Sequence, residues 1–449
     1  MFTKVVVANR GAVAARVLRA LYELGIKSTA VYSEADYGAP YLDLASEAYE
    51  IGPAPAADSY LNQERLIGAI QRSAADGVHP GYGFLSESAE FAQRVIDAGA
   101  RFIGPSPKWI AAMGHKTRAR ALAAEHGMPV SRGSDVLPSD PEAVLAAARA
   151  IGFPVLVKPA AGGGGIGMLP VRDATELLAA VERSRSMATR GFGNADVYLE
   201  RLIERPRHVE FQLLGDNHGA LAHLFERDCS TQRRNQKVIE EAPAPGIGRA
   251  EAEGMAAKVA AIMRELGYDN IGTVEMLYGA DGSFSFLEMN TRLQVEHGVT
   301  EEITGVDLVK AQIRCAAGEA LATVLSDPLE LRGHAIQARV YAEDPRNFFP
   351  SPGKLKVFRP PQDRTIRVET GYAEGRDVTP HYDPMIAKVI VHAPTREQAI
   401  EKLAPALAAF DIQGVKHNIP AVLAVLHSDA FREGRLHTGL ISELAARKT

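Results

Sequence analysis

Two glutamates on either side of an Asp-Gly pair are the residues of this chain best placed to do chemistry. Glu275 and Glu288 flank Asp281-Gly282, and both flanking runs alternate β-rich residues. This setting predicts a two-residue type I′ turn, which places Glu275 directly opposite Glu288 on one sheet face. Opposed like charges destabilise a sheet unless a hard cation such as Mg²⁺ binds their oxygens. Because Asn290 follows on the same face, the sequence predicts a metal site of Glu275, Glu288 and Asn290.

Polar residues continue at every second position beyond the hairpin. They are Glu288, Asn290, Arg292, Gln294 and Glu296. Successive side chains of an extended chain point to opposite faces, so we expect two acids, two amides and a guanidinium in a row on one face. A solvated strand with ordinary charge pairing would show the same alternation. The facing Glu275 is what favours a functional site.

A run of four glycines, Gly162 to Gly165, follows Lys158. Glycines free backbone N–H groups to point inward as a phosphate nest, and the lysine supplies a point charge for phosphate oxygens. The residues from Met168 to Pro170 predict a second strand, since proline is disfavoured inside a helix. We therefore expect a strand–loop–strand flap over a nucleotide, although a flexible connector has a similar composition.

Two common nucleotide fingerprints do not apply to this loop. The glycines at 162, 164 and 167 match G-x-G-x-x-G, but that fingerprint must open a helix. The P-loop pattern G-x-x-x-x-G-K-[ST] does not occur in the chain. The flap, the acidic pair, the amide and the arginine together indicate ATP-dependent phosphoryl transfer with Mg²⁺, in which the protein positions reactants and neutralises developing charge.

Three units are expected to position these residues. Strands at 4–8 and 28–32 around a helix at 12–24 indicate a parallel, Rossmann-like α/β unit over 1–114, although residues 9–11 lack a dinucleotide fingerprint. An α+β unit is predicted over 115–330, with a glycine-rich lid at about 131–203, and a third unit over 331–449. The predicted fold class is α/β, with α+β in the centre.

Composition excludes several classes of function. The 449 residues carry a net charge of −5 with no long basic run, so neither nucleic acid nor a membrane surface is an expected partner. No segment approaches the roughly 20 apolar residues of a membrane span. Cys229 and Cys315 are the two cysteines, which fits a reducing cytosol. A strand begins almost at once, so we expect no targeting peptide and a cytoplasmic location.

Longer strings carry a family resemblance over essentially the whole chain. They include residues 7–11 (VANRG), 51–55 (IGPAP), 79–87 (HPGYGFLSE), 104–105 (GP), 206–210 (PRHVE), 226–230 (ERDCS), 236–245 (QKVIEEAPAP) and 288–297 (EMNTRLQVEH). With these strings in this order, the chain resembles biotin carboxylase, the ATP-grasp component of biotin-dependent carboxylases such as acetyl-CoA/propionyl-CoA carboxylase. Other ATP-grasp ligases share the acidic pair but not these strings.

The resemblance implies a reaction and a set of roles. ATP phosphorylates bicarbonate to carboxyphosphate, which carboxylates the N1′ nitrogen of biotin, with Mg²⁺ or Mn²⁺ as the metal. The implied nucleotide contacts are Lys116, Lys158, Gly164, Gly165, Met168, Glu200, Arg201, Leu202, Ile203, His208, Gln232 and Asn235. The implied bicarbonate site is Lys237, Arg292, Gln294 and Val295, with Glu296 as the base. Arg339 is implied to stabilise the biotin enolate, and Tyr82 to pack against biotin.

The chain departs from the family pattern at several positions. Ala12 stands where the family usually has Glu, Ile166 where it has a basic residue, Asn235 where many members have His, and Gly298 where Pro is frequent. None of these departures removes a residue that is essential to the implied reaction. They leave open whether the affinity for the nucleotide is altered.

Partners and alternatives follow from the same resemblance. No Met is followed by Lys, so the Met-Lys-Met acceptor of biotin carriers is absent. A separate biotin carboxyl carrier protein and a carboxyltransferase are therefore implied, and the family is commonly homodimeric. The alternatives are a non-catalytic paralogue that binds nucleotide, and another ATP-grasp ligase acting on a small carboxylate. The final carboxyl acceptor belongs to the transferase.

Overall fold

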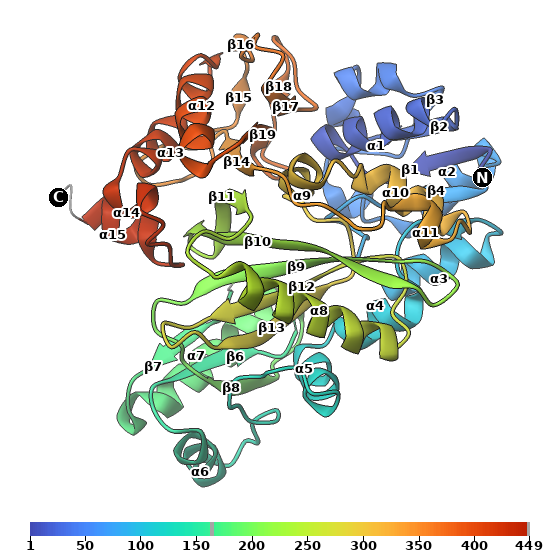
Figure 1. The fold of residues 1–449 in the computed structure, drawn as a ribbon. Helices are drawn as coiled ribbons and strands as arrows, with labels where there is room; N and C mark the ends of the chain where they lie inside the picture. The colour runs from blue at the N-terminus through green and yellow to red at the C-terminus, as the bar shows by residue number, and fades with distance from the viewer. Residues whose placement is uncertain (162–165, 447–449) are drawn as a thin grey trace.

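The computed structural model describes residues 1–161 and 166–446. An N-terminal unit, blue in Figure 1, contains a parallel five-stranded sheet in the order β3-β2-β1-β4-β5. Its elements are β1 (Lys4–Val7), α1 (Gly11–Glu23), β2 (Lys27–Tyr32), η1 (Glu34–Asp36), η2 (Pro40–Leu44), β3 (Glu47–Glu50), η3 (Ala56–Asp58), α2 (Gln63–Ser73), β4 (Gly77–His79), α3 (Ala89–Asp97), β5 (Arg101–Phe102) and α4 (Pro107–Met113). The expected parallel α/β arrangement is confirmed.

A lid follows, built on a small antiparallel sheet in the order β7-β6-β8. This part of the chain comprises α5 (Lys116–Glu125), α6 (Pro141–Ile151), β6 (Val155–Pro159), β7 (Leu169–Val171), α7 (Ala174–Phe192) and β8 (Val197–Arg201). Strands β6 and β7 form the hairpin expected around the glycine loop. The loop glycines 162–165 themselves, including Gly164 and Gly165, lie outside the described residues.

An eight-stranded antiparallel sheet forms the centre of the molecule, in the order β13-β12-β9-β10-β11-β14-β19-β17. Its strands are β9 (Arg207–Gly215), β10 (Leu221–Arg233), β11 (Gln236–Ala242), β12 (Ile271–Tyr278), β13 (Phe284–Asn290), β14 (His334–Tyr341), β17 (Arg367–Glu369) and β19 (Met385–Ala393). The sheet runs on across residue 330, where the sequence suggests a boundary. Strand β11 pairs directly with β14.

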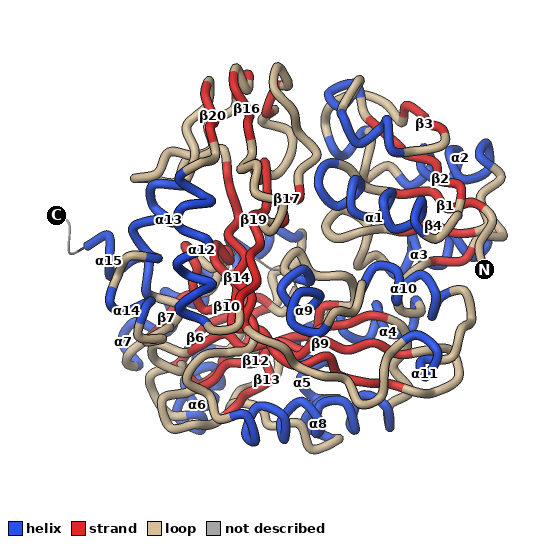
Figure 2. The backbone as a smooth tube through the Cα atoms, turned by 45° about the horizontal axis from the view of Figure 1, so that its top comes forward, coloured by secondary structure: helices blue, strands red, loops and turns tan. Residues whose placement is uncertain are grey.

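Helices cover this sheet on both sides. Apolar residues of α8 (Arg249–Glu265) pack on Val209, Phe211 and Val274, and Figure 2 shows α8 lying along strands β9, β12 and β13. The other elements of this half are α9 (His297–Thr304), α10 (Leu308–Ala316), α11 (Leu321–Val324), β15 (Gly353–Lys354), β16 (Val357–Arg359), β18 (Asp377–Val378), α12 (Arg396–Ala408), β20 (Asp411–Gln413), α13 (Ile419–Leu426), α14 (Asp429–Arg432) and α15 (Leu440–Ala446). Within the described residues, no helix is both long and apolar enough to span a membrane.

The hairpin turn differs from the prediction by one residue. Gly279 N–H donates to Ser283 O at 2.9 Å and Gly282 N–H donates to Gly279 O at 3.1 Å, so the turn is longer than two residues. Gly282 has φ +79°, the left-handed conformation that glycine adopts readily. Tyr278 then pairs with Phe284, but a bulge beyond Met276 restores the expected pairing of Glu275 with Glu288. The prediction that Glu275 faces Glu288 is therefore confirmed. The longer turn shifts the register by one residue, and the bulge shifts it back.

The strand after the hairpin is shorter than expected. β13 ends at Asn290, the residues that follow form bends and a turn, and Glu296 is the N-cap of α9 with φ −86° and ψ 9°. The prediction of a single extended face from 288 to 296 is therefore wrong. Gln294 and Glu296 still reach the group around Glu275 and Lys237, because the chain turns after Asn290 to start α9.

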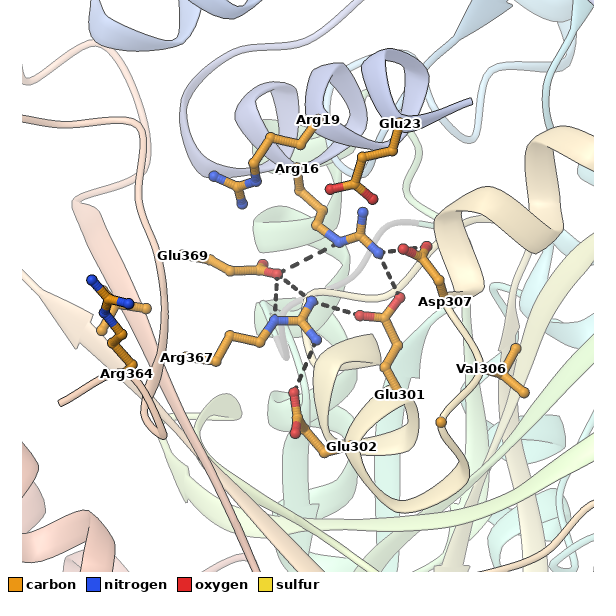
Figure 3. Close-up of a pocket in the computed structure, with 12 residues that line it drawn as sticks. Arg16, Arg19, Glu23, Glu301, Glu302, Val306, Asp307, Arg364, Arg367 and Glu369 are labelled. Carbon is orange, nitrogen blue, oxygen red and sulfur yellow. Dashed lines mark hydrogen bonds and ion pairs between the residues drawn. The ribbon is translucent and has the colours of Figure 1, made fainter. Parts of the chain in front are cut away.

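Buried charges join the N-terminal unit to α9 and β17. Arg16 on α1 donates to Glu301 at 2.9 Å and to Asp307 at 2.6 Å, and Arg367 binds Glu301 at 2.5 Å and also contacts Glu369. Figure 3 shows these side chains at one pocket, with Glu301 of α9 between the two guanidinium groups. Helix α9 is thus fixed by ion pairs from two units.

A close backbone contact adds to this attachment. A Cβ atom built on Gly371 would lie 2.3 Å from Cα and from the carbonyl carbon of Gly11. We predict that Gly371→Ala lowers the free energy of unfolding by about 1–3 kcal/mol, the usual cost of overpacking. Gly254→Ala is the control, since that position on α8 is open and alanine there stabilises a helix by about 1 kcal/mol or less. Urea unfolding measures both. Equal midpoints for the two variants would contradict the close contact.

Candidate active site

Three glutamates line up across three neighbouring strands of the large sheet. Glu210 on β9 pairs with Glu275 on β12, which pairs with Glu288 on β13. On the other side Glu210 pairs with Arg227 of β10, and the Arg227 Nε donates to Glu210 at 2.6 Å. Paired residues share a face, so antiparallel pairing gathers the carboxylates. Their opposite face is the apolar one under α8.

Lys237 of β11 is the cation at the centre of this group. Its Nζ lies 2.6 Å from Glu210, 2.7 Å from Glu275 and 2.6 Å from Glu296. Burial opposes its charge, but these three carboxylates hold the pKa of Lys237 well above its ordinary value. Although burial also disfavours the charged form of Glu296, Lys237 and then Arg339 hold the pKa of Glu296 well below its usual range. Glu296 is therefore ionised.

Glu275 has further donors around it. His208 Nε2 lies 2.9 Å away, Asn290 Nδ2 donates at 2.8 Å and Gln294 Nε2 at 3.1 Å. Glu288 is instead paired with Lys116 at 2.9 Å. Against the effect of burial, Lys237 and then His208 hold the pKa of Glu275 well below its usual range. The side chains of Lys116, Lys237 and His208 thus contact the same carboxylates that would bind a metal cation.

The donors present fit a hard divalent cation. Glu275 and Glu288 offer carboxylate oxygens from paired positions, and Asn290 offers an amide oxygen, which are the ligands Mg²⁺ prefers. A second group, His208, Glu210 and Glu275, has its ligand atoms within 4.8 Å of one another. We favour the first set, because a histidine nitrogen suits Mg²⁺ poorly and both Arg227 and Lys237 already bind Glu210.

Arg292 connects this group to the N-terminal unit. Its Nε donates to Glu87 at 2.8 Å, while its other nitrogens donate to Asn290 at 2.9 Å and Gln294 at 3.2 Å. Arg339 of β14 approaches from the other side. It donates to Glu296 at 3.0 Å and to buried Glu240 at 2.5 Å. Two guanidinium groups therefore flank the carboxylates from different units.

A second cluster lies under the lid. Lys158 of β6 donates to Glu200 of β8 at 2.8 Å, and both side chains are buried. Glu200 Oε1 and Arg120 Nε form an ion pair at 3.8 Å, a separation too long for a hydrogen bond. Glu200 is therefore held by two cations, Lys158 and Arg120.

A cavity of about 340 Å³ opens beside Arg339, between the N-terminal unit and β14. Its lining includes Tyr82, Arg292, Val295, Arg339 and Tyr341. The hydroxyl of Tyr82 is buried without a hydrogen-bond partner in the described structure. The cavity is thus an aromatic-walled space that is also lined by three arginines, Arg10, Arg292 and Arg339.

Some expected site residues do not join these clusters. The Arg201 side chain turns to the carbonyls of Gly152 and Phe153, and Asn235 is exposed in the β10–β11 turn with φ +64°. Leu202 and Ile203 follow β8 beside the lid cluster, and Met168 precedes β7. Gln232 lies beside His208, with its amide nitrogen 2.9 Å from His208 Nδ1.

Sequence reasoning missed three residues of the central group. Glu210, Arg227 and Glu240 are all buried, and each contacts an expected site residue or its neighbour. The alternation of His208, Glu210 and Gln212 inside an otherwise apolar strand was a usable signal for Glu210. No comparable pattern marks Arg227 or Glu240.

Two departures from the family pattern have a structural reading. A Cβ on Gly298 would lie 2.5 Å from Ile390 Cδ1, so a side chain there would require the end of the Ile390 side chain to shift. Ala12 lines the cavity beside Arg339, where a smaller residue leaves more space. Ile166 is exposed on the lid.

Known proteins match the whole chain. Family models match as biotin carboxylase, N-terminal domain (residues 1–110), carbamoyl-phosphate synthase L chain, ATP binding domain (115–324), and biotin carboxylase C-terminal domain (337–443). Biotin carboxylase 2 of Bacillus subtilis (strain 168) is 48% identical over 99% of this chain and 100% of its own. The biotin carboxylase of Halalkalibacterium halodurans is 46% identical over 100% of this chain and 99% of its own.

Solved structures agree. The biotin carboxylase domain dimer of Hydrogenobacter thermophilus 2-oxoglutarate carboxylase, in complex with MgADP, ADP and bicarbonate, superimposes with TM-score 0.95 at 43% identity, over 99% of this chain and 98% of that one. A β,γ-ATP complex of Campylobacter jejuni biotin carboxylase gives TM-score 0.95 at 39% identity, over 99% of both chains. Fold and site define an ATP-dependent ligase of the ATP-grasp class. Within that class, the chain belongs to the biotin carboxylase family.

The Lys237 cluster generates a stability prediction. Lys237→Met leaves three buried carboxylates without their shared cation, so we expect a loss of about 3–5 kcal/mol in the free energy of unfolding at pH 8. Exposed Lys258→Met on α8 is the control and should change little. Urea unfolding at pH 8 and pH 5 measures the loss.

The loss should shrink as the pH falls. In the wild-type protein the folded pKa values of Glu275 and Glu296 are depressed, so their stabilising effect is present above the ordinary value near 4.5 and is lost on acidification through the folded values. In the variant, burial raises these pKa values, and protonation then relieves the buried charge at low pH. A deficit that grows from pH 8 to pH 5 would contradict this account.

Proposed function

We propose that the protein uses MgATP to carboxylate biotin with bicarbonate, through carboxyphosphate, on a separate carrier protein. The observation that carries the proposal is the ammonium of Lys237 within 2.7 Å of three carboxylates, beside Arg292 and Arg339. Bicarbonate is a weak nucleophile, so a base and a fixed guanidinium are what its activation needs.

The nucleotide is assigned to the space between the lid and the central sheet. The nucleotide contacts that we assign are Lys116, Lys158, His208, Gln232 and Glu200, together with the backbone of 201–203, Met168, Asn235 and the loop glycines Gly164 and Gly165. The ammonium groups of Lys116 and Lys158 supply charge for phosphate oxygens.

Glu275, Glu288 and Asn290 would hold Mg²⁺ or Mn²⁺. When bound, the metal neutralises charge on the transferring phosphoryl group. The protein's own part is to hold these oxygens on paired strands. Lys116 and Lys237 contact Glu288 and Glu275 here, and Lys237 also contacts Glu210 and Glu296, so both ammonium groups lie beside the carboxylates that would hold the metal.

Bicarbonate is assigned to Lys237, Arg292, Gln294 and the backbone of Val295. Glu296 Oε1 lies beside Lys237 and accepts the bicarbonate proton, while Arg292 orients the anion bidentately. Biotin is assigned to the cavity beside Arg339, whose guanidinium stabilises the ureido oxygen as negative charge develops there. Tyr82 packs against the ring.

The proposed partners, assembly, location and domain units follow from membership of the biotin carboxylase family. The proposed partners are a biotin carboxyl carrier protein and a separate carboxyltransferase, a homodimer is the proposed assembly, and the cytoplasm the proposed location. The dimer of the related Hydrogenobacter domain supports the assembly. The proposed units are 1–114, 115–330 with its lid at about 131–203, and 331–449, the last two sharing one sheet.

Phosphate release from MgATP, with and without bicarbonate and free biotin, tests this function. We expect release that requires bicarbonate and rises with biotin. In Glu296→Gln it should fall by about 100-fold or more, as expected when a general base is lost. Glu253→Gln on the exposed face of α8 is the matched control.

Two results would count against the proposal. Tight ATP binding without turnover, also with a biotinylated carrier domain, would favour a non-catalytic paralogue. Phosphate release driven by another small carboxylate, and not by bicarbonate, would favour a different ATP-grasp ligase.

A further inference from the structure

Lys388 is a fully buried lysine that none of the roles above uses. It lies on β19, directly opposite Arg339 of β14 on one side and Glu369 of β17 on the other. Two cations directly opposite each other destabilise a sheet, and burial holds the pKa of Lys388 below its ordinary value even though Glu369 opposes that effect. A lysine kept at such a position needs a reason other than sheet stability.

Its contacts reach the active-site segment. Lys388 Nζ donates to the carbonyl oxygen of Val295 at 2.8 Å and lies 2.6 Å from Glu369. It also lies 5.9 Å from the centre of the Tyr82 ring. The ammonium therefore stands directly behind the cavity assigned to biotin, and it touches the residue before Glu296.

The Val295 carbonyl belongs to the peptide bond that enters Glu296. Because a peptide unit is planar, a hydrogen bond that fixes this oxygen also fixes the direction of the Glu296 N–H and the position of its Cα. Glu296 caps α9 without a side-chain cap hydrogen bond. The start of the helix is thus oriented from outside, by Lys388.

Glu369, the acidic partner of Lys388, is itself held in place by ion pairs. Glu369 is bound by Arg367, and Arg367 also binds Glu301, which lies on α9 itself (Figure 3). Val299 and Ile303 of the same helix pack on an apolar cluster with Ile390 of β19. Strands β17 and β19 therefore hold α9 along its length, and Lys388 holds the residue that precedes Glu296.

We propose that Lys388 is a positioning residue of the carboxylation reaction, which sets the Val295–Glu296 peptide relative to Lys237 and Arg339 and links it to the Glu369–Arg367–Glu301 ion pairs. The inference rests on the proposed function. Lys388 acts through Val295 and Glu296, and it leaves the nucleotide site beneath the lid untouched.

The test removes the hydrogen bond without leaving a buried charge unpaired. In the double variant Lys388→Met/Glu369→Gln, we expect kcat/KM for bicarbonate to fall by about tenfold or more, since misplacing a reacting group by about 1 Å costs on the order of 100-fold. The KM for ATP and the rise in Tm on adding MgADP should stay near the wild-type values. This split is not expected of a general loss of folding.

The double variant Glu253→Gln/Lys258→Met, on the exposed face of α8, is the matched control. It makes the same two kinds of substitution away from Val295 and from the Glu369 ion pairs, so bicarbonate kinetics should stay within about threefold of wild type, a change that corresponds to less than about 1 kcal/mol of transition-state stabilisation. If Lys388→Met/Glu369→Gln does not fold, Lys388→Gln/Glu369→Gln replaces it, because the two amides can hydrogen-bond each other and the shorter side chain does not reach Val295.

Three outcomes would overturn the inference. The first is a folded Lys388 double variant with wild-type bicarbonate kinetics. The second is an equal loss in the ATP and bicarbonate parameters together with a lost MgADP shift, which is a structural effect only. The third is a wild-type protein without bicarbonate-dependent phosphate release, which would remove the proposed function itself and this inference with it.

Discussion

The charge balance around Lys237 is the constraint on which the rest of the site depends. Antiparallel pairing of β9, β12 and β13 places three glutamates in one row, and Glu296 adds a fourth carboxylate from the start of α9. Buried carboxylates at this density cannot all ionise without cations. Lys237, shared by three of them, is the first of the cations that hold the pKa of Glu275 and Glu296 well below the usual range, whereas burial raises the pKa of Glu210. The same arrangement suits a site that must receive a metal, a polyphosphate and an anion.

The continuity of the large sheet decides which cations reach this group. Strand β11, which carries Lys237 and Glu240, pairs with β14, which carries Arg339. A chain that divided cleanly at residue 330 would separate the residues that we assign to bicarbonate from Arg339, which we assign to biotin. Because backbone hydrogen bonds of the sheet cross that position, both sets are held in one rigid frame, as catalytic groups must be to keep their geometry.

A second layer of buried charge supports the first. The ion pairs of Arg16, Arg367, Glu301 and Glu369 fix α9 to the N-terminal unit and to β17, and Lys388 fixes the peptide that leads into this helix. The position of Glu296 is therefore set by residues that are distant from it in the sequence, on α1, β17 and β19. Such groups are costly to bury singly, and here they occur as a connected network in which each charge has an opposite partner.

Local sequence was sufficient for features that depend on neighbours along the chain. Alternation and the Asp-Gly turn indicated that Glu275 faces Glu288, because side-chain direction in a strand follows sequence parity, although a bulge was needed to bring the register back. The strand–loop–strand lid followed from Pro170 in the same way. Sequence parity does not say which strands lie side by side, so Glu210, Glu240 and Lys388 became part of the site only through tertiary pairing. Contacts between residues distant in sequence also decided that the Arg201 side chain bonds the carbonyls of Gly152 and Phe153, and that β13 ends at Asn290, where the chain leaves the sheet to start α9; local alternation carries no information on such contacts.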